Sequence, residues 1–317
     1  MESTPVKAKG SGSQPLFGLS DTQQMMFAFG DSRRPNIETA KIIEAVVLNQ
    51  ITEIVYEAVK VSNLRGFKAV QLESIIFLMR KSPLKIQRLI KYLSAKELSR
   101  KSTKVADGEV EDQKKKSLMC RCKDFIECID DTGALLAACD EEYFDEFYLE
   151  RLLKNDTITK NMDDKRYREF CNARTVGFRG SYSVKFQASL EDLYSGLELK
   201  VEKVTQEVLS YLAYETLGQL VEMCLVLRRD TAGDPVARVT PARSVNTEYP
   251  SVFLPASAAA VKSETGGDTK SELPGHAISP AEIREVIRRL EQSVHCDRIL
   301  SRGARSKPSR NMPLIAI

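Results

Sequence analysis

Few residues of this chain have side chains that could do chemistry together, and the most suggestive are three cysteines. Cys120, Cys122 and Cys128 lie close together in the sequence, and thiolates at short spacing are zinc ligands. A structural zinc site needs four ligands, but no fourth cysteine and no histidine is near, since the two histidines are His276 and His295. We therefore predict ordinary thiols in a helical segment, with no metal and no cofactor.

The motifs of common catalytic sites are also missing from the sequence. It contains no glycine-rich phosphate-binding loop, no Gly-x-Ser-x-Gly turn and no His-Glu-x-x-His motif. The two histidines lie in regions expected to be disordered or terminal, where they could contribute little acid–base catalysis. We predict that the protein is not an enzyme, has no small-molecule substrate and works by binding other macromolecules.

Carboxylates offer two candidate binding surfaces. Glu215 and Glu222 are seven residues apart in an expected helix, which nearly aligns them on one face. They are either contacts for a basic partner or ordinary solvated or intramolecular acids. Residues 140–150 interleave aromatic residues with carboxylates. This segment is either a docking surface for a basic partner or a helix that packs its aromatic side chains inward.

Composition narrows the class of protein. The length of 317 residues suggests about two domains, and 42% hydrophobic with 29% charged residues suits a soluble globular chain. A net charge of +3 is too small to indicate nucleic-acid binding by itself. We expect residues 1–17 to be a disordered N-terminus without a signal peptide, and no apolar run reaches the length of about 18 residues that spans a membrane. The odd number of cysteines, seven, favours reduced, intracellular thiols.

One long helix organises the first half of the chain. Residues 37–65 contain no Pro or Gly, end at Gly66 and repeat apolar side chains with a period of about 3.6 residues. We expect a short helix before it at 22–29, an extended piece after it at 67–70 and a second short helix at 71–81. This order is the histone-fold pattern, whose long helix keeps one apolar flank for a second copy to cover. The apolar positions are Ile43, Val47, Ile51, Ile54, Ala58 and Val61.

A linker region follows the first unit. A further helix at 83–98 completes that unit, which we place at 18–98. Residues 99–117 read as a charged linker, and their Lys114–Lys116 block is either a solvated part of it or a nuclear-import signal. Residues 118–175 are expected to form a helical linker region.

The histone-fold pattern then recurs in residues 180–295. We expect a short helix at 183–193, a second long helix at 200–229 and a third helix at 280–292. Residues 230–275 are poor in bulky apolar residues and rich in Pro, Ser, Thr, Ala and Gly, so we expect a disordered insertion there.

We therefore predict an all-α protein in which two histone folds of one chain form an intramolecular pair. Each long helix leaves an apolar flank, and each buried Leu or Val on it would contribute about 1.5–3 kcal/mol. Gly218, inside the second long helix, could permit the close approach of a crossing helix. Residues 296–317 form a basic tail, and its last residues, 312–317, are apolar and could fold back onto the core.

Several short motifs, in chain order, carry a family resemblance. They are residues 25–35, Leu64-Arg65-Gly66, residues 77–81, Asp130-Asp131-Thr132-Gly133, Glu169-Phe170-Cys171, residues 211–216 and residues 283–289. Together they resemble the Suppressor-of-Ty-three family, the double histone-fold subunits of the SAGA transcription coactivator complex. The resemblance covers about residues 18–295 and extends, more distantly, to paired histone-fold subunits of the general factor TFIID.

The resemblance implies a non-enzymatic subunit of a nuclear transcription coactivator. Its expected partners are other SAGA subunits and the TATA-binding protein, which it would help to deliver to RNA polymerase II promoters. Glu215 and Glu222 would then be candidate contacts for the TATA-binding protein. Histone folds often carry an acid early in the third helix that clamps a basic loop residue. Glu282 fills this place in the second fold, whereas Ser74 stands there in the first, with Lys68 as the expected partner.

Two alternative functions stay open from the sequence. A histone-fold pair can bind DNA phosphates through basic residues at its loops, and Arg33, Arg34, Arg65 and Lys68 are candidates for a weak DNA contact. The matching loop of the second fold, at 194–198, is not basic. The other alternative is a TFIID-type subunit.

Overall fold

Helices dominate the computed structural model, which describes residues 20–106, 117–140, 145–160, 162–179, 183–231, 277–300 and 313–317. The all-α prediction is confirmed, with two very short strands added. In chain order the elements are α1 (Asp21–Ala28), α2 (Ile37–Leu64), β1 (Ala69–Val70), α3 (Leu72–Met79), α4 (Pro83–Ala106), α5 (Leu118–Ile129), α6 (Ala134–Asp140), α7 (Glu146–Lys160), α8 (Asp164–Thr175), α9 (Val184–Gly196), β2 (Lys200–Val201), α10 (Lys203–Thr231) and α11 (Pro280–Leu300).

Local sequence signals set the ends of the first helices. The Ser20 hydroxyl accepts a hydrogen bond from the Gln23 backbone N–H, and the Gln23 side chain accepts one from the Ser20 N–H, which is a capping box. Asn36 caps α2 by accepting from the Glu38 N–H at 2.8 Å. Beyond α2, Gly66 adopts a φ of +75°, which a residue without Cβ tolerates easily. The predicted ends of these two helices therefore agree with the observed ones to within one residue.

A parallel pairing of the two short strands joins the halves of the chain. Ala69 of β1 lies opposite Lys200 of β2, and Val70 lies opposite Val201. The prediction of a helix starting at Lys200 is wrong at its first residues, which are extended because they make this pairing. The predicted loop at 194–196 is instead the last turn of α9.

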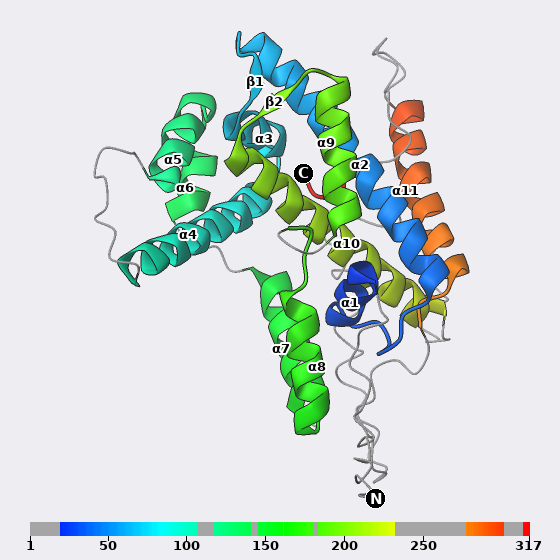
Figure 1. Cartoon of the computed structure of the whole chain (residues 1–317). Helices are drawn as coiled ribbons and strands as arrows, with labels where there is room; N and C mark the ends of the chain where they lie inside the picture. The colour runs from blue at the N-terminus through cyan, green and yellow to red at the C-terminus, as the bar shows by residue number, and fades with distance from the viewer. Residues whose placement is uncertain are drawn as a thin grey trace, which may run out of the picture.

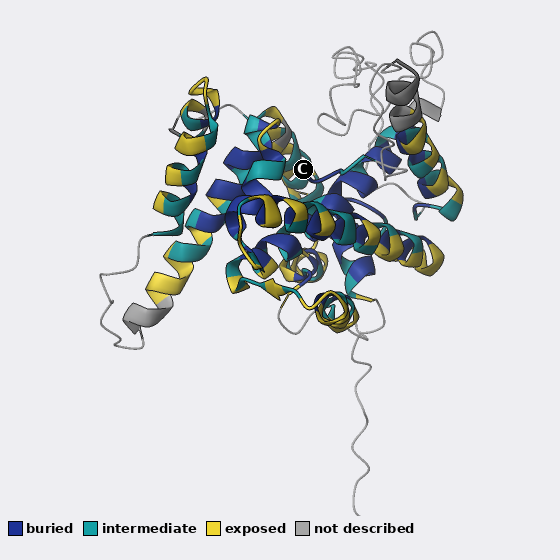
Figure 2. Cartoon of the chain, turned by 90° about the horizontal axis from the view of Figure 1, so that it is seen from above, coloured by how far each residue is buried: buried dark blue, intermediate teal, exposed yellow. Residues whose placement is uncertain are grey.

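The hydrophobic core lies where the two long helices cross (Figure 1). Ile43, Val47 and Ile51 of α2 are fully buried, and α10 and α11 both pack against this helix. Figure 2 shows the buried residues gathered at the centre and the exposed ones at the rim. The elements α9, β2, α10 and α11 follow one another in the order expected for a second histone fold. That they form such a fold stays a prediction.

Close approach at Gly218 is visible in the packing of α10. A Cβ at this position would lie 2.5 Å from the ring of Phe29, the residue that follows α1. The neighbour that needs the glycine is therefore an aromatic side chain and not the backbone of a crossing helix.

The expected acid near the start of α11 does clamp a basic residue, but that residue belongs to the long helix α10 and not to a loop. Glu282 accepts hydrogen bonds from Arg228 of α10 at 2.7 and 2.9 Å, and this pairing lowers the pKa of Glu282 to about 2. In the first half the Ser74 hydroxyl lies 2.8 Å from that of Ser62, while the neighbouring Glu73 accepts from Arg121 of α5 at 2.6 Å.

The middle of the chain departs from the predicted boundaries. Helix α4 continues to Ala106, so residues 99–106 of the expected linker are helical. The region after it holds two helices, α5 and α6, separated by a turn in which the Asp130 carboxylate accepts from the Leu135 N–H at 2.7 Å. Helices α7 and α8 extend away from the two long helices in Figure 1, and α8 packs against α1. In this contact, Phe170 of α8 packs edge-on against Phe27 of α1.

Some expectations fall outside the described residues. These are the N-terminal residues 1–17, the Lys114–Lys116 block, almost all of the insertion 230–275 and the greater part of the basic tail. Within the ranges that the structure describes, no group of three or more His, Cys, Asp or Glu side chains could hold a metal ion. No helix within those ranges is long and apolar enough to cross a membrane.

Candidate partner-binding site

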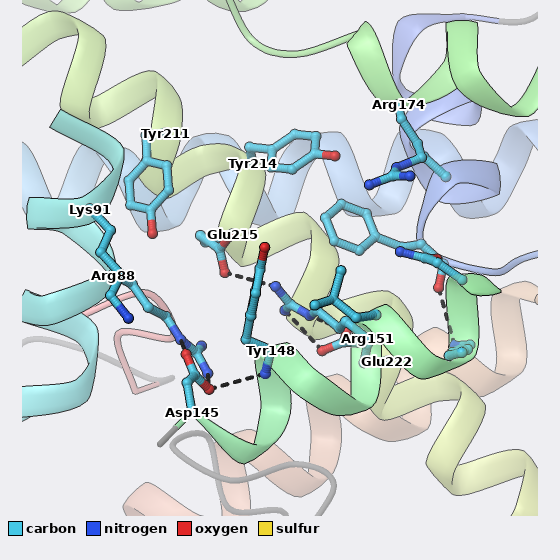
Figure 3. Close-up of a pocket in the computed structure, with 15 residues that line it drawn as sticks. Arg88, Lys91, Asp145, Tyr148, Arg151, Arg174, Tyr211, Tyr214, Glu215 and Glu222 are labelled. Atoms are coloured by element: carbon cyan, nitrogen blue, oxygen red, sulfur yellow. Dashed lines mark hydrogen bonds and ion pairs between the residues drawn. The ribbon is translucent and has the colours of Figure 1, made fainter. Parts of the chain in front are cut away.

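The two predicted contact residues lie together around an arginine that sequence reasoning missed. Arg151 of α7 donates to Glu222 of α10 at 2.6 and 3.1 Å and lies 3.4 Å from Glu215, one side of the group shown in Figure 3. Burial alone would lower the pKa of Arg151, but the two carboxylates raise it. Glu215 and Glu222 are therefore intramolecular partners, as one of the two sequence interpretations allowed. Whether they also contact a partner protein stays a prediction.

A cavity of about 460 Å³ opens beside this group. Helices α4, α7 and α10 and the end of α1 form its walls. Four aromatic side chains give it an apolar lining, and the charged groups are set among them (Figure 3). Burial raises the pKa of Tyr211, so this phenol stays neutral at physiological pH. The aromatic residues are Phe29, Tyr148, Tyr211 and Tyr214.

A second ion pair fixes the start of α7 at the other side of the cavity. Arg88 of α4 donates two hydrogen bonds to Asp145, at 2.6 and 2.7 Å. Asp145 also accepts from the Tyr148 N–H at 3.0 Å, in the first turn of the helix. Burial would raise the pKa of Asp145, but its hydrogen bond to Arg88 lowers it. The two arginines thus hold α7 against α4 and α10, although α7 itself projects from the core.

Helix α7 carries several exposed apolar side chains, two of which, Tyr148 and Leu152, also line the cavity. Tyr148 is 60% exposed and Leu153 is 59% exposed, and Leu149 and Leu152 are also exposed between them. Large apolar side chains gathered on an exposed helix are typical of protein-binding surfaces. Within the segment 140–150, Tyr148 lines the cavity and is also largely exposed, so both interpretations of this segment stay predictions.

Two of the four candidate DNA contacts interact with other side chains of the chain. Arg33 makes an ion pair with Glu169 of α8 at 2.6 Å. The Arg65 guanidinium lies 4.9 Å from the ring centres of both Phe67 and Phe125. Arg34 and Lys68 are exposed. Arg33 and Arg34 precede the 28-residue helix α2, whereas Arg65 and Lys68 follow it, so the candidates lie in two groups at opposite ends of this helix, and a DNA contact stays a prediction.

Comparison with known proteins gives the family. The model of the transcription initiation factor IID 18-kDa subunit matches residues 18–108. TFIID subunit 13 of Dictyostelium discoideum is 38% identical over 87 residues, which are 27% of this chain and 80% of that protein. The SAGA complex subunit Spt3 of Drosophila melanogaster is 26% identical over 235 residues, and that of Saccharomyces cerevisiae is 26% identical over 250.

The Spt3 matches extend far beyond the first histone fold. They cover 72% of this chain for the fly protein and 66% for the yeast protein. The chain spans only 58% of the length of the fly relative and 73% of the yeast one. Matches of this length must extend beyond residue 108, where the match to the TFIID model ends. This chain belongs to the family of the TFIID 18-kDa histone-fold subunit and is a homologue of the SAGA subunit Spt3.

Proposed function

We propose that this protein is a non-enzymatic subunit of a SAGA-like transcription coactivator complex in the nucleus. It binds other subunits of the complex and the TATA-binding protein, and it helps to deliver that protein to RNA polymerase II promoters. The observation that carries the proposal is the similarity to Spt3 proteins over most of the chain.

The surface around α7 and α10 is the proposed docking face for the TATA-binding protein. It combines the exposed apolar side chains of α7, from Tyr148 to Leu153, with the cavity and with the carboxylates of Glu215 and Glu222. A protein that binds the DNA backbone carries basic surfaces, which favour an acidic partner. Because both glutamates are paired with Arg151, a basic side chain of the partner would have to share or replace this arginine.

Binding of purified TATA-binding protein to the full chain tests this docking face. We expect Glu215→Lys and Glu222→Lys to weaken binding by about tenfold or more, because each reverses a charge beside Arg151. Leu153→Asp should weaken binding too, and it leaves the ion pairs in place. The matched control is Glu191→Lys on α9, an exposed acid away from the cavity. If all three variants bind as the control does, with unchanged thermal stability, this face is not the docking site.

Membership of the complex is tested by purification of the full chain from nuclear extract, followed by mass spectrometry. Recovery of SAGA subunits supports the proposal. The family match over residues 18–108 favours one alternative, a TFIID-type subunit, and recovery of TFIID alone would select it. A weak DNA contact is a separate question, which gel shifts over a range of salt concentrations answer by their slope.

A further inference from the structure

The last residues of the chain return to the middle of the molecule. The C label of Figure 1 lies among the helices of the core, next to α2 and α10. Ile315 is fully buried and Ala316 is 3% exposed, and Leu314 and Ile317 pack partly against the same core. The sequence suggested that the apolar residues 312–317 could fold back, and the described residues 313–317 do lie against the core.

Two side chains hold the backbone of this segment. The side-chain oxygen of Gln50, on α2, accepts a hydrogen bond from the Ile315 N–H at 2.9 Å. The ammonium of Lys85, on α4, donates to the carbonyl oxygens of Ile315 at 3.0 Å and of Ile317 at 3.2 Å. One main-chain N–H and two main-chain oxygens of the segment are thus hydrogen-bonded to side chains. Proteins that bind extended peptides commonly use main-chain hydrogen bonds in this way.

Gln50 and Lys85 are polar side chains that lie beside residues of the apolar core. Gln50 precedes the fully buried Ile51, and Lys85 precedes the fully buried Ile86. Both polar residues are themselves buried, at 4% and 8% exposure. Burying an amide or an ammonium is costly unless it is hydrogen-bonded, and the tail backbone supplies three of these bonds. The hydrogen bonds to residues 313–317 therefore account for the burial of Gln50 and Lys85.

We propose that α2 and α4 form a peptide-binding slot and that residues 313–317 of this same chain are its ligand. The slot selects an extended, apolar segment: Gln50 and Lys85 bind its backbone, and the core receives the side chain at position 315. Occupancy ties α4, which extends beyond the histone-fold pattern, to the long helix α2. Twelve residues, 301–312, separate the segment from α11, and such a stretch can span up to about 40 Å, which lets one chain fill its own slot.

Binding in trans tests the slot directly. The receptor is the chain truncated after residue 311, and the probe is a fluorescent peptide of residues 311–317. We expect saturable binding, at least about tenfold weaker for the peptide with Ile315→Asp and similarly weaker for the receptor with Lys85→Met. Absence of saturable binding to the folded receptor, or equal binding of both peptides, would overturn the proposal.

A full-length variant decides the matter if the truncated chain does not fold. Ile315→Asp should release the segment, lower Tm by roughly 5 °C or more and speed amide exchange in α4 at least about tenfold, while α10 stays protected. The matched control is Leu64→Asp, the same type of change at a residue that is 87% exposed. If both variants exchange alike in α4, the segment does not hold this helix. A dimer of the wild-type chain that separates when the segment is removed would assign the ligand to a second copy and refute the intramolecular form.

Discussion

Replacing Glu282 by Gln should remove most of the electrostatic link between α10 and α11. The two carboxylate oxygens accept from Arg228 at 2.7 and 2.9 Å, and one of them also accepts from the Ser279 N–H at 2.7 Å. Glutamine keeps the shape, and its oxygen can still accept from Ser279, but its NH2 group then faces an N–H of Arg228, so the change removes the charge and one hydrogen bond. The ion pair between Arg228 and Glu282 matters because it connects the C-terminal part of α10 to the first turn of α11.

The size of the effect follows from the pKa of Glu282. The hydrogen bond from Arg228 is the main cause that lowers it from an ordinary 4.5 to about 2, and at about 1.4 kcal/mol per pH unit this corresponds to about 3 kcal/mol. The side chain is 24% exposed, so solvent screens part of this. We expect Glu282→Gln to lower the free energy of unfolding by about 2 kcal/mol at pH 7.

The direction in which stability changes with pH follows from the lowered pKa of Glu282. Because the folded-state pKa is depressed, the stabilisation is complete above the ordinary pKa of 4.5 and is lost as the pH falls from about 5 towards 2. The wild-type chain should therefore lose stability over this range more steeply than Glu282→Gln, and the difference between them should shrink.

Urea unfolding at a series of pH values measures both quantities. The matched control is Glu291→Gln, an exposed acid on the same helix, which should unfold like the wild type at every pH. If Glu282→Gln costs less than about 0.5 kcal/mol at pH 7, or if its pH dependence parallels that of the wild type, the ion pair does not stabilise the fold as argued.

Three further changes test other parts of the packing. Gly218→Val should lower the free energy of unfolding by about 1–3 kcal/mol in thermal melts, because its Cβ would meet the Phe29 ring at 2.5 Å; unchanged stability would mean that the ring has room to move. Arg121→Met should cost about 2 kcal/mol in urea, since this arginine donates to carboxylates of both halves; a loss below about 0.5 kcal/mol would contradict this. Burial raises the pKa of Cys122 to about 12, so iodoacetamide at pH 7.5 should alkylate the exposed Cys120 and leave Cys122 intact by mass spectrometry; equal labelling would show that α5 opens readily.

Sequence reasoning succeeded where the cause is local. The apolar period of residues 37–65 and the stop at Gly66 each act over a few neighbours, and they predicted α2 almost to the residue. The same holds for the start of α11, where Ser279 and Glu282 form a local hydrogen-bonded cap. Periodicity also indicated that the long helices need partners.

The missed features depend on residues far apart in the chain. Strand β2 exists because Lys200 and Val201 meet β1, more than a hundred residues earlier, and no local pattern marks them as extended. The sequence could not predict the ion pairs of Arg151 with Glu215 and Glu222, because the pattern of side chains on α10 does not indicate which other helix packs against that face. For the same reason, the sequence left open whether the two glutamates contact a partner or are ordinary solvated or intramolecular acids.

The two halves complete one another, so the first half should not be stable alone. The Thr39 hydroxyl of α2 donates to the Ile278 carbonyl at 2.7 Å, and the fully buried Asp31 carboxylate accepts from the Ile278 N–H at 2.9 Å. A fragment of residues 18–106 would lose these bonds and expose the apolar flank of α2 that α10 and α11 cover. We expect this fragment to aggregate or stay unfolded by circular dichroism, and to be recovered folded when it is co-expressed with residues 117–317. A monomeric fragment with a cooperative thermal transition of its own would show that the halves are independent units, and the intramolecular pair would have to be abandoned.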